Sequence, residues 1–370
     1  MGLLGWIKTK LFPAPAIAGV VEPRPAAPAR APRERPQAES QTGSQTRSSD
    51  SALPPRAPAS SASRAALLRA RVGPLDGDEH LAGKLDNPES DLLERLRQRI
   101  ESGELDIPLL PPTSVTALEV ANRPSVDVHQ LVQTIARDPL ITSELLRIAN
   151  SALYATQNKA GSLQQAIMRI GIKAVRNVVF SAAMKSSLSN ARRLNEYAEE
   201  VWRQSQSVAA VARKLGASTG FEREQAYLIG LLHDIGKIVL LGMLQREMRD
   251  MSRLSPALVG RTFRLFHESA GGAIAAQWKL PIEIVSVASK HHDFASNEDY
   301  PRAAALAKLA HEIDLRLSLR DEGGVRMLVE SPALEFLGIR NETARWQLIE
   351  AAREEWEAHA HSHPQLSGPR

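Results

Sequence analysis

Cysteine is absent from the 370-residue sequence, which excludes disulfide bonds, thiolate metal ligands and catalysis by a cysteine nucleophile. Aromatic residues make up only 4% of the chain, too few to suggest the stacking platforms that bind single-stranded nucleic acids. The sequence also lacks a secretory pattern at its start and any run of about 18 uninterrupted apolar residues. We therefore expect a cytoplasmic protein.

The charge of the chain is only slightly positive, with 46 basic residues against 42 acidic ones. Much of the arginine excess lies in a proline-rich N-terminal tract and between Arg345 and Arg353. A diffuse excess of this size is more typical of solubility than of a nucleic-acid footprint, so we do not expect a nucleic-acid partner. Binding through the basic surface stays open as an alternative that a salt titration would test.

The N-terminal quarter differs in composition from the rest. Residues 13–86 hold nearly half of the 23 prolines, mixed with alanine, serine, glutamine and arginine. Such a segment buries too little apolar surface to fold, so it is predicted to be a disordered linker. Residues 1–12 place large apolar side chains beside Lys8 and Lys10, which suggests a short amphipathic helix. Peripheral membrane contact through that helix and a frayed end with no role are both open, because so short a helix is marginal alone.

From residue 87 onward the apolar residues recur at helical spacing. One example, on a single face of a predicted helix, is the set Leu92, Leu93, Leu96 and Ile100. Asp138 followed by Pro139 is typical of a helix start, because the carboxylate caps the first turn and proline fits its first position. Alternating apolar and polar runs of strand length are lacking. The fold class is therefore predicted to be all-α.

The pattern divides this helical part into two lobes that follow the linker. Residues 87–189 are assigned to an N-terminal helical lobe, in which Gly171 interrupts a long helix. Residues 190–358 are assigned to a second helical core with C-terminal helices, including a predicted helix over Glu222–Leu241. Residues 359–370 are polar and are expected to fray.

The pair His233-Asp234 lies within this apolar helix and is followed by Gly236 and Lys237. Adjacent residues on a helix point about 100° apart, so both side chains can reach one ion only where the helix axis borders the site. That arrangement is unusual for core packing. The context favours descent from a metal site over the alternative of a hydrogen-bonded core histidine.

Further candidate ligands follow downstream, at His267 and at the pair His291-His292. Imidazole and carboxylate ligands suit divalent ions such as Mn, Fe, Mg or Zn, and such clusters position water against a phosphate. Each histidine taken alone is more often a solvated surface residue. Together with His233 and Asp234, their order along the chain indicates a common site.

Several segments in the same order as in a known family carry a resemblance. They are Ala136–Ile141, Leu145–Ser151, Ser162–Ile167, Val201–Ser205 and the apolar context of the His233-Asp234 pair. Over Leu105–Leu317 the sequence resembles the HDOD proteins, relatives of the HD and HD-GYP phosphohydrolases in which the HD core serves as an output domain. This resemblance implies a two-lobed helical protein with a role in bacterial signal transduction.

The resemblance also implies that the metal site is degenerate. Active HD phosphohydrolases carry a first histidine where this sequence has Gln204, and a closing aspartate where it has Lys308. An ammonium at Lys308 would repel a divalent ion, or take its place and pair with Asp234. We therefore expect no catalytic residues and no required cofactor. The vestigial metal ligands are His233, Asp234, His267, His291 and His292, and a residual Mn, Fe, Mg or Zn ion stays possible.

Two functions follow as hypotheses. The first is a non-catalytic bacterial signal-transduction output or scaffold protein that acts on other signalling proteins, with its former metal cleft kept for structure or for a small-molecule or nucleotide ligand. The second is a metal-dependent phosphohydrolase or phosphodiesterase acting on nucleotides or cyclic dinucleotides, in which Lys237 contacts phosphate.

Overall fold

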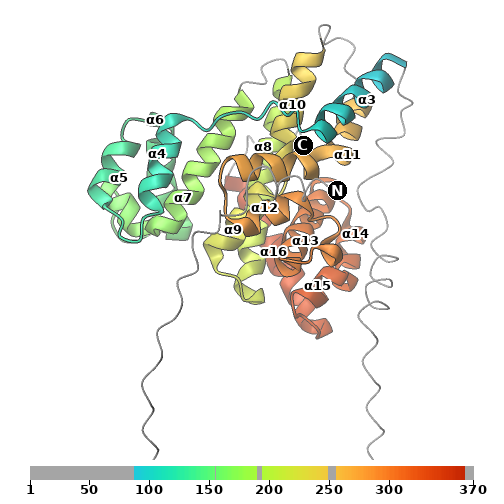
Figure 1. The fold of residues 1–370 in the computed structure, drawn as a ribbon. Coiled ribbons are helices and arrows are strands. Elements are labelled where there is room, and N and C mark those ends of the chain that lie inside the picture. The colour runs from blue at the N-terminus through green and yellow to red at the C-terminus, as the bar shows by residue number, and fades with distance from the viewer. Residues whose placement is uncertain (1–86, 155, 190–193, 249–255, 363–370) are drawn as a thin grey trace, which may run out of the picture.

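The computed structural model describes residues 87–154, 156–189, 194–248 and 256–362 (Figure 1). Within these ranges every regular element is a helix and no strand occurs, so the predicted all-α fold is confirmed. The amphipathic segment predicted at residues 1–12 and the linker predicted at 13–86 lie outside the described residues.

The first lobe consists of α4 to α7. Its elements are α4 (Pro112–Ala121), α5 (Val128–Ile135), α6 (Pro139–Ala149), the short 3-10 helix η2 (Ala152–Tyr154) and α7 (Leu163–Ser189). Asp138 caps α6 by accepting hydrogen bonds from the backbone N–H groups of Leu140 (2.9 Å) and Ile141 (3.1 Å), as predicted. Gly171 kinks α7 with a φ of 81° and a ψ of 160°, which explains the predicted interruption.

The second lobe follows and contains the more deeply buried helices. Its elements are α8 (Asn195–Thr219), α9 (Arg223–Leu232), α10 (Gly236–Glu247), α11 (Pro256–Gln277), α12 (Ile282–Ser289), η5 (Phe294–Ser296), α13 (Pro301–Ser318), α14 (Glu322–Met327), η6 (Leu328–Glu330), α15 (Pro332–Phe336) and α16 (Glu342–Ser362). Most side chains of α13 are buried, because α8, α9 and α12 to α16 pack around it. The helix α16 continues through residues 359–362, which the sequence assigned to the frayed tail.

The first helix of the described chain, α3 (Asn87–Ser102), packs on the second lobe rather than on the first (Figure 1). Arg99 binds Glu247 at the end of α10 at 2.7 Å, and the indole of Trp278 donates to the carbonyl of Pro108 at 2.8 Å. The first lobe therefore starts at α4 and not at residue 87, because the apolar face of α3 is covered by α11.

The segment Arg223–Glu247 is long and apolar enough to cross a bilayer, but 78% of its most apolar window is buried inside the fold. The single helix predicted over Glu222–Leu241 is divided into α9 and α10. Between them the chain tightens into turns in which Ile235 N donates to Leu232 O (3.2 Å) and Lys237 N to Asp234 O (3.0 Å). This tightening lies at the His-Asp pair.

Two glycines let the helices behind this turn approach backbone to backbone. A Cβ atom on Gly236, at the start of α10, would lie 2.0 Å from the carbonyl oxygen of His267 in α11. A Cβ atom on Gly271 would lie 2.6 Å from the carbonyl oxygen of Ala288 in α12. The helices α10, α11 and α12 therefore pack in direct backbone contact near the His-Asp turn.

Replacing Gly236 with alanine should strain this contact, because the obstacle is backbone and cannot rotate away. We expect Gly236→Ala to lower the free energy of unfolding by roughly 1–3 kcal/mol. The matched control is Gly242→Ala on the same helix, where an added Cβ meets nothing within 4 Å. It should raise stability by up to about 1 kcal/mol. Urea unfolding followed by circular dichroism measures both, and equal stability of the two variants would contradict the close approach.

Candidate metal centre

The carboxylate of Asp234 lies at the centre of a buried cluster of imidazoles. His233 and Asp234, at the turn after α9, are 0% and 1% exposed. Oδ1 lies 3.4 Å from His267 Nε2 and 3.5 Å from His291 Nε2. Oδ2 lies 3.2 Å from His233 Nε2 and 3.6 Å from His311 Nδ1. The carboxylate therefore separates two groups of imidazoles.

Each group meets the spacing that a metal ion requires. Asp234, His267, His291 and His292 form one set whose ligand atoms lie within 4.8 Å of one another, and His233, Asp234 and His311 form the other. All five ligand candidates from the sequence are thus brought together by the turn after α9, by α11 and by the segment after α12. We call the first set the Oδ1 side and the second the Oδ2 side.

The hydrogen bonds of three imidazoles fix which nitrogen faces the carboxylate. Nδ1 of His233, His267 and His291 lies 2.8, 2.6 and 3.2 Å from the carbonyl oxygens of Gly230, Phe263 and Val287. A carbonyl only accepts, so each Nδ1 carries a proton and each ring turns its Nε2 toward Asp234. Burial lowers the pKa of His267 and His291, so in these two neutral rings Nε2 presents a lone pair. Backbone carbonyls orient metal-binding histidines in the same way.

The Oδ1 side contains buried polar atoms without hydrogen bonds. Among the described residues, Oδ1 of Asp234 and Nε2 of His267 and His291 have no hydrogen-bond partner, whereas Oδ2 has the ammonium of Lys237 at 2.6 Å. Burial lowers the pKa of His267, and that of His291 still further, so these rings stay neutral and cannot neutralise the carboxylate. A divalent cation between the lone pairs and Oδ1 would satisfy all three groups. The residues present therefore fit a metal ion on this side.

The Oδ2 side is satisfied by the protein itself. Lys237 places its ammonium 2.6 Å from Oδ2 and donates to the amide oxygen of Gln204 at 3.1 Å. His233 Nε2 lies 2.9 Å from His311 Nδ1, close enough for one ring to donate to the other. Burial alone would raise the pKa of Asp234, but the neighbouring His233 and Lys237 hold it well below its usual value. Gln204, which stands where a first histidine was expected, thus positions Lys237.

Lys308 acts on a different member of the cluster than the sequence suggested. Its buried ammonium lies 3.2 Å from His292 Nδ1 and 3.5 Å from a carboxylate oxygen of Glu312. An ammonium can only donate, so Nδ1 of His292 accepts and its lone pair is directed at Lys308. The ammonium 2.6 Å from Asp234 belongs to Lys237 and not to Lys308. From the sequence, only a contact with phosphate was predicted for Lys237.

Two members of the site were missed from the sequence. His311 lies one helical turn after Lys308 in α13, and this i, i+3 spacing was the available signal for a shared face. Glu268 follows His267 directly and accepts a hydrogen bond from the backbone N–H of His292 at 2.8 Å. Burial raises the pKa of Glu268 to about 7.

The family model of the HDOD domain matches residues 107–294, which include the first lobe and most of this centre. The chain belongs to the HDOD domain family. An uncharacterized protein from Treponema pallidum (strain Nichols) is 24% identical over 197 residues, which is 51% of this chain and 38% of that protein. The chain thus spans less than two fifths of the length of this curated relative.

Two solved structures share the HDOD fold over nearly their whole length. One is a protein from Shewanella amazonensis SB2B that is provisionally named a metal-dependent phosphohydrolase, with a TM-score of 0.56, 24% identity and coverage of 72% of this chain and 99% of that one. The other is an HDOD domain protein of unknown function from Geobacter sulfurreducens, with a TM-score of 0.52, 20% identity and coverage of 73% and 98%. At these identities the likeness shows the fold alone.

The two sides of Asp234 predict different effects of histidine removal on metal binding. We expect His267→Ala to lower the affinity for Fe(II) or Zn(II) at least about tenfold, because it deletes a lone pair of the Oδ1 side. His311→Ala should retain the ion, because the Oδ2 side is held by hydrogen bonds and Lys237. His129→Ala, at an exposed position of α5, controls for adventitious binding. Elemental analysis after dialysis measures all three, and equal loss in His267→Ala and His311→Ala would contradict the asymmetry.

Proposed function

We propose that this chain is a non-catalytic, cytoplasmic bacterial signal-transduction protein. In this proposal the metal centre around Asp234 holds one divalent ion for structure or sensing. The observation that supports the proposal is the pair of ammonium groups inside the centre. Lys237 lies against the carboxylate that two ions would have to share, and Lys308 lies against His292.

The charges of the centre favour one ion over two. Asp234 is the carboxylate between the two sides, and the imidazoles of the Oδ1 side are neutral. A second divalent ion at Oδ2 would lie within a few ångströms of the Lys237 ammonium, and at that distance like charges in a buried site repel strongly. The Lys237 ammonium would therefore have to be removed before Oδ2 could coordinate a second ion.

The donor types narrow the identity of the ion. The Oδ1 side offers imidazole nitrogens and one carboxylate oxygen. Imidazole suits Fe and Zn, whereas Mg prefers oxygen ligands and keeps much of its water. Among the four ions considered from the sequence, we propose Fe or Zn, with Mn next.

A metal-dependent phosphohydrolase or phosphodiesterase acting on nucleotides or cyclic dinucleotides is the second candidate. It is favoured by Glu268, a partly buried carboxyl beside His291 and His292 whose raised pKa, about 7, suits proton transfer. Lys237, which that hypothesis assigned to phosphate, is engaged by Asp234 and Gln204. This engagement is the reason for placing hydrolysis second.

Turnover assays on metal-loaded protein separate the two candidates. We expect protein carrying Fe or Zn to show no hydrolysis of nucleoside phosphates or cyclic dinucleotides above the level of Asp234→Ala, because the Lys237 ammonium occupies the carboxylate oxygen that a two-ion centre would need. Lys237→Ala should raise the bound metal from about one to about two ions per chain, since it frees Oδ2. Turnover by the wild type that Asp234→Ala abolishes would establish the hydrolase instead.

Partners of the proposed output protein would be other signalling proteins, reached through the predicted linker at 13–86. We expect a pull-down with the full chain to recover a partner that residues 87–370 alone bind at least about tenfold more weakly, because tethering raises the local concentration.

A variant lacking only residues 1–12 tests their predicted membrane contact separately, through co-sedimentation with anionic vesicles. Equal recovery by all three proteins would remove the linker from the proposal.

A further inference from the structure

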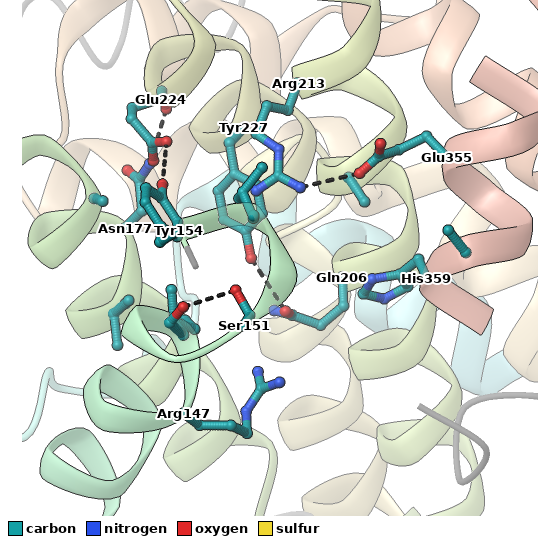
Figure 2. Close-up of a pocket in the computed structure, with 16 residues that line it drawn as sticks. Arg147, Ser151, Tyr154, Asn177, Gln206, Arg213, Glu224, Tyr227, Glu355 and His359 are labelled. Atoms are coloured by element: carbon teal, nitrogen blue, oxygen red, sulfur yellow. Dashed lines mark hydrogen bonds and ion pairs between the residues drawn. The ribbon is translucent and has the colours of Figure 1, made fainter. Parts of the chain in front are cut away.

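A cavity of about 440 Å³ lies between the two lobes, away from the metal centre (Figure 2). Its walls come from α6, η2 and α7 of the first lobe and from α8, α9 and α16 of the second. Small-molecule sites in proteins have volumes of about 300–1,000 Å³ and occur preferentially between structural units. None of the residues around Asp234 lines this cavity.

One part of the cavity wall is apolar and one part is aromatic. The apolar residues are Ile148, Leu153, Ala174, Val178, Ala210 and Ala358. The ring of Tyr227 lines the cavity with its hydroxyl donating to Gln206 at 3.1 Å (Figure 2). Ala174 of the first lobe and Ala210 of the second add small side chains to this wall. An apolar wall that includes the ring of Tyr227 suits an aromatic ligand, because aromatic rings pack favourably against each other.

Arg213 supplies donors on the polar side of the cavity. Its side chain is 15% exposed and lies over Tyr227, with the guanidinium carbon 5.6 Å from the ring centroid. Glu355 accepts one hydrogen bond from it at 3.0 Å. A guanidinium has five N–H donors in a planar fork, so Arg213 retains donors for a carboxylate or phosphate.

The acidic groups in the cavity are occupied by the protein itself. The carboxylate of Glu224 accepts hydrogen bonds from the hydroxyl of Tyr154 (2.7 Å) and the amide of Asn177 (2.9 Å), which link the first lobe to α9 (Figure 2). Glu355 is bound to Arg213. Both carboxylates are thus held by protein donors, and Arg213 is the charged donor that an anionic ligand meets beside Glu355.

We infer that the inter-lobe cavity binds a small aromatic anion of about mononucleotide size, with its ring on the apolar wall beside Tyr227 and its carboxylate or phosphate on Arg213. The ligand would contact both lobes, because both line the cavity. The occupant can be a nucleoside monophosphate or an aromatic carboxylate, which share this chemistry.

The helices that line the cavity also carry the metal centre. The helix α9 has Glu224 and Tyr227 in the cavity near its start and ends at Leu232, directly before His233. The helix α8 places Gln206 in the cavity two residues after Gln204, which holds Lys237 beside Asp234. A ligand that fixes these helices acts as an effector of the metal centre, a step that rests on the metal site proposed above.

Binding is tested by isothermal titration of the full chain with AMP, GMP and indole-3-acetate. Adenosine and inorganic phosphate are the arms that lack, respectively, the anion and the ring. We expect saturable binding of at least one of the three aromatic anions and at least about tenfold weaker binding of the two fragments. Saturation by a nucleotide alone or by the carboxylate alone identifies the source of the ligand.

Variants place the ligand in the cavity. Arg213→Gln should weaken binding about tenfold or more, whereas Arg316→Gln, a 14% exposed arginine bound to Asp321 at 2.7 Å, should leave it unchanged. Ala210→Phe fills the cavity without changing charge and should abolish binding. No saturable binding of any aromatic anion, or binding that survives in both Arg213→Gln and Ala210→Phe, would overturn the inference.

The effector step has its own readout. We expect a saturating ligand to change at least about twofold the rate at which a chelator removes Fe or Zn from the wild type, but not from Arg213→Gln. An unchanged rate in ligand-bound wild type would overturn the coupling while leaving the cavity site in place. Because the titration itself does not require metal, failure of the cavity site is distinguishable from failure of the metal centre.

Discussion

The carboxylate of Asp234 is buried where four imidazoles and one ammonium surround it, and this burial constrains every helix that supplies them. Removing a carboxylate from water costs several kcal/mol unless partners compensate. On the Oδ2 side, Lys237 supplies a compensating charge. On the Oδ1 side, neutral rings turn lone pairs toward the same group, which is unfavourable until a cation lies between them. The asymmetry of the centre follows from this one charge.

The backbone contacts of the second lobe serve this arrangement. Gly236 and Gly271 allow α10, α11 and α12 to touch through backbone atoms, so that His267 on α11 and His291 in the segment after α12 both approach Asp234. The tight turn at residues 233–235 lets two consecutive side chains face the same interior.

The sequence was sufficient for the helical fold and for most of the centre, and the reasons for its failures are physical. His267, His291 and His292 were identifiable because they follow an apolar His-Asp motif in the order along the chain that the HDOD resemblance implies. The break after Leu232 was not identifiable, because apolar residues continue on both sides of it. The turn is imposed instead by the packing of Gly236 on α11. The sequence also did not show on which lobe α3 packs. Its apolar face could pack on either lobe, and in the structure it is α11 that covers this face.

His311 shows the limit of reasoning by replacement. Lys308 stands in the expected position of a ligand, but the next turn of the same helix directs the imidazole of His311 at the same carboxylate. The structure does not restore the missing ligand, however, because His311 Nδ1 lies 2.9 Å from His233 Nε2 and the two rings can satisfy each other. Counting histidines therefore overestimates the metal capacity of this centre. What decides it is which atoms have neither a hydrogen-bond donor nor a cation beside them. Within the described part of the centre these are Oδ1 of Asp234 and Nε2 of His267 and His291, because Oδ2 has the Lys237 ammonium at 2.6 Å.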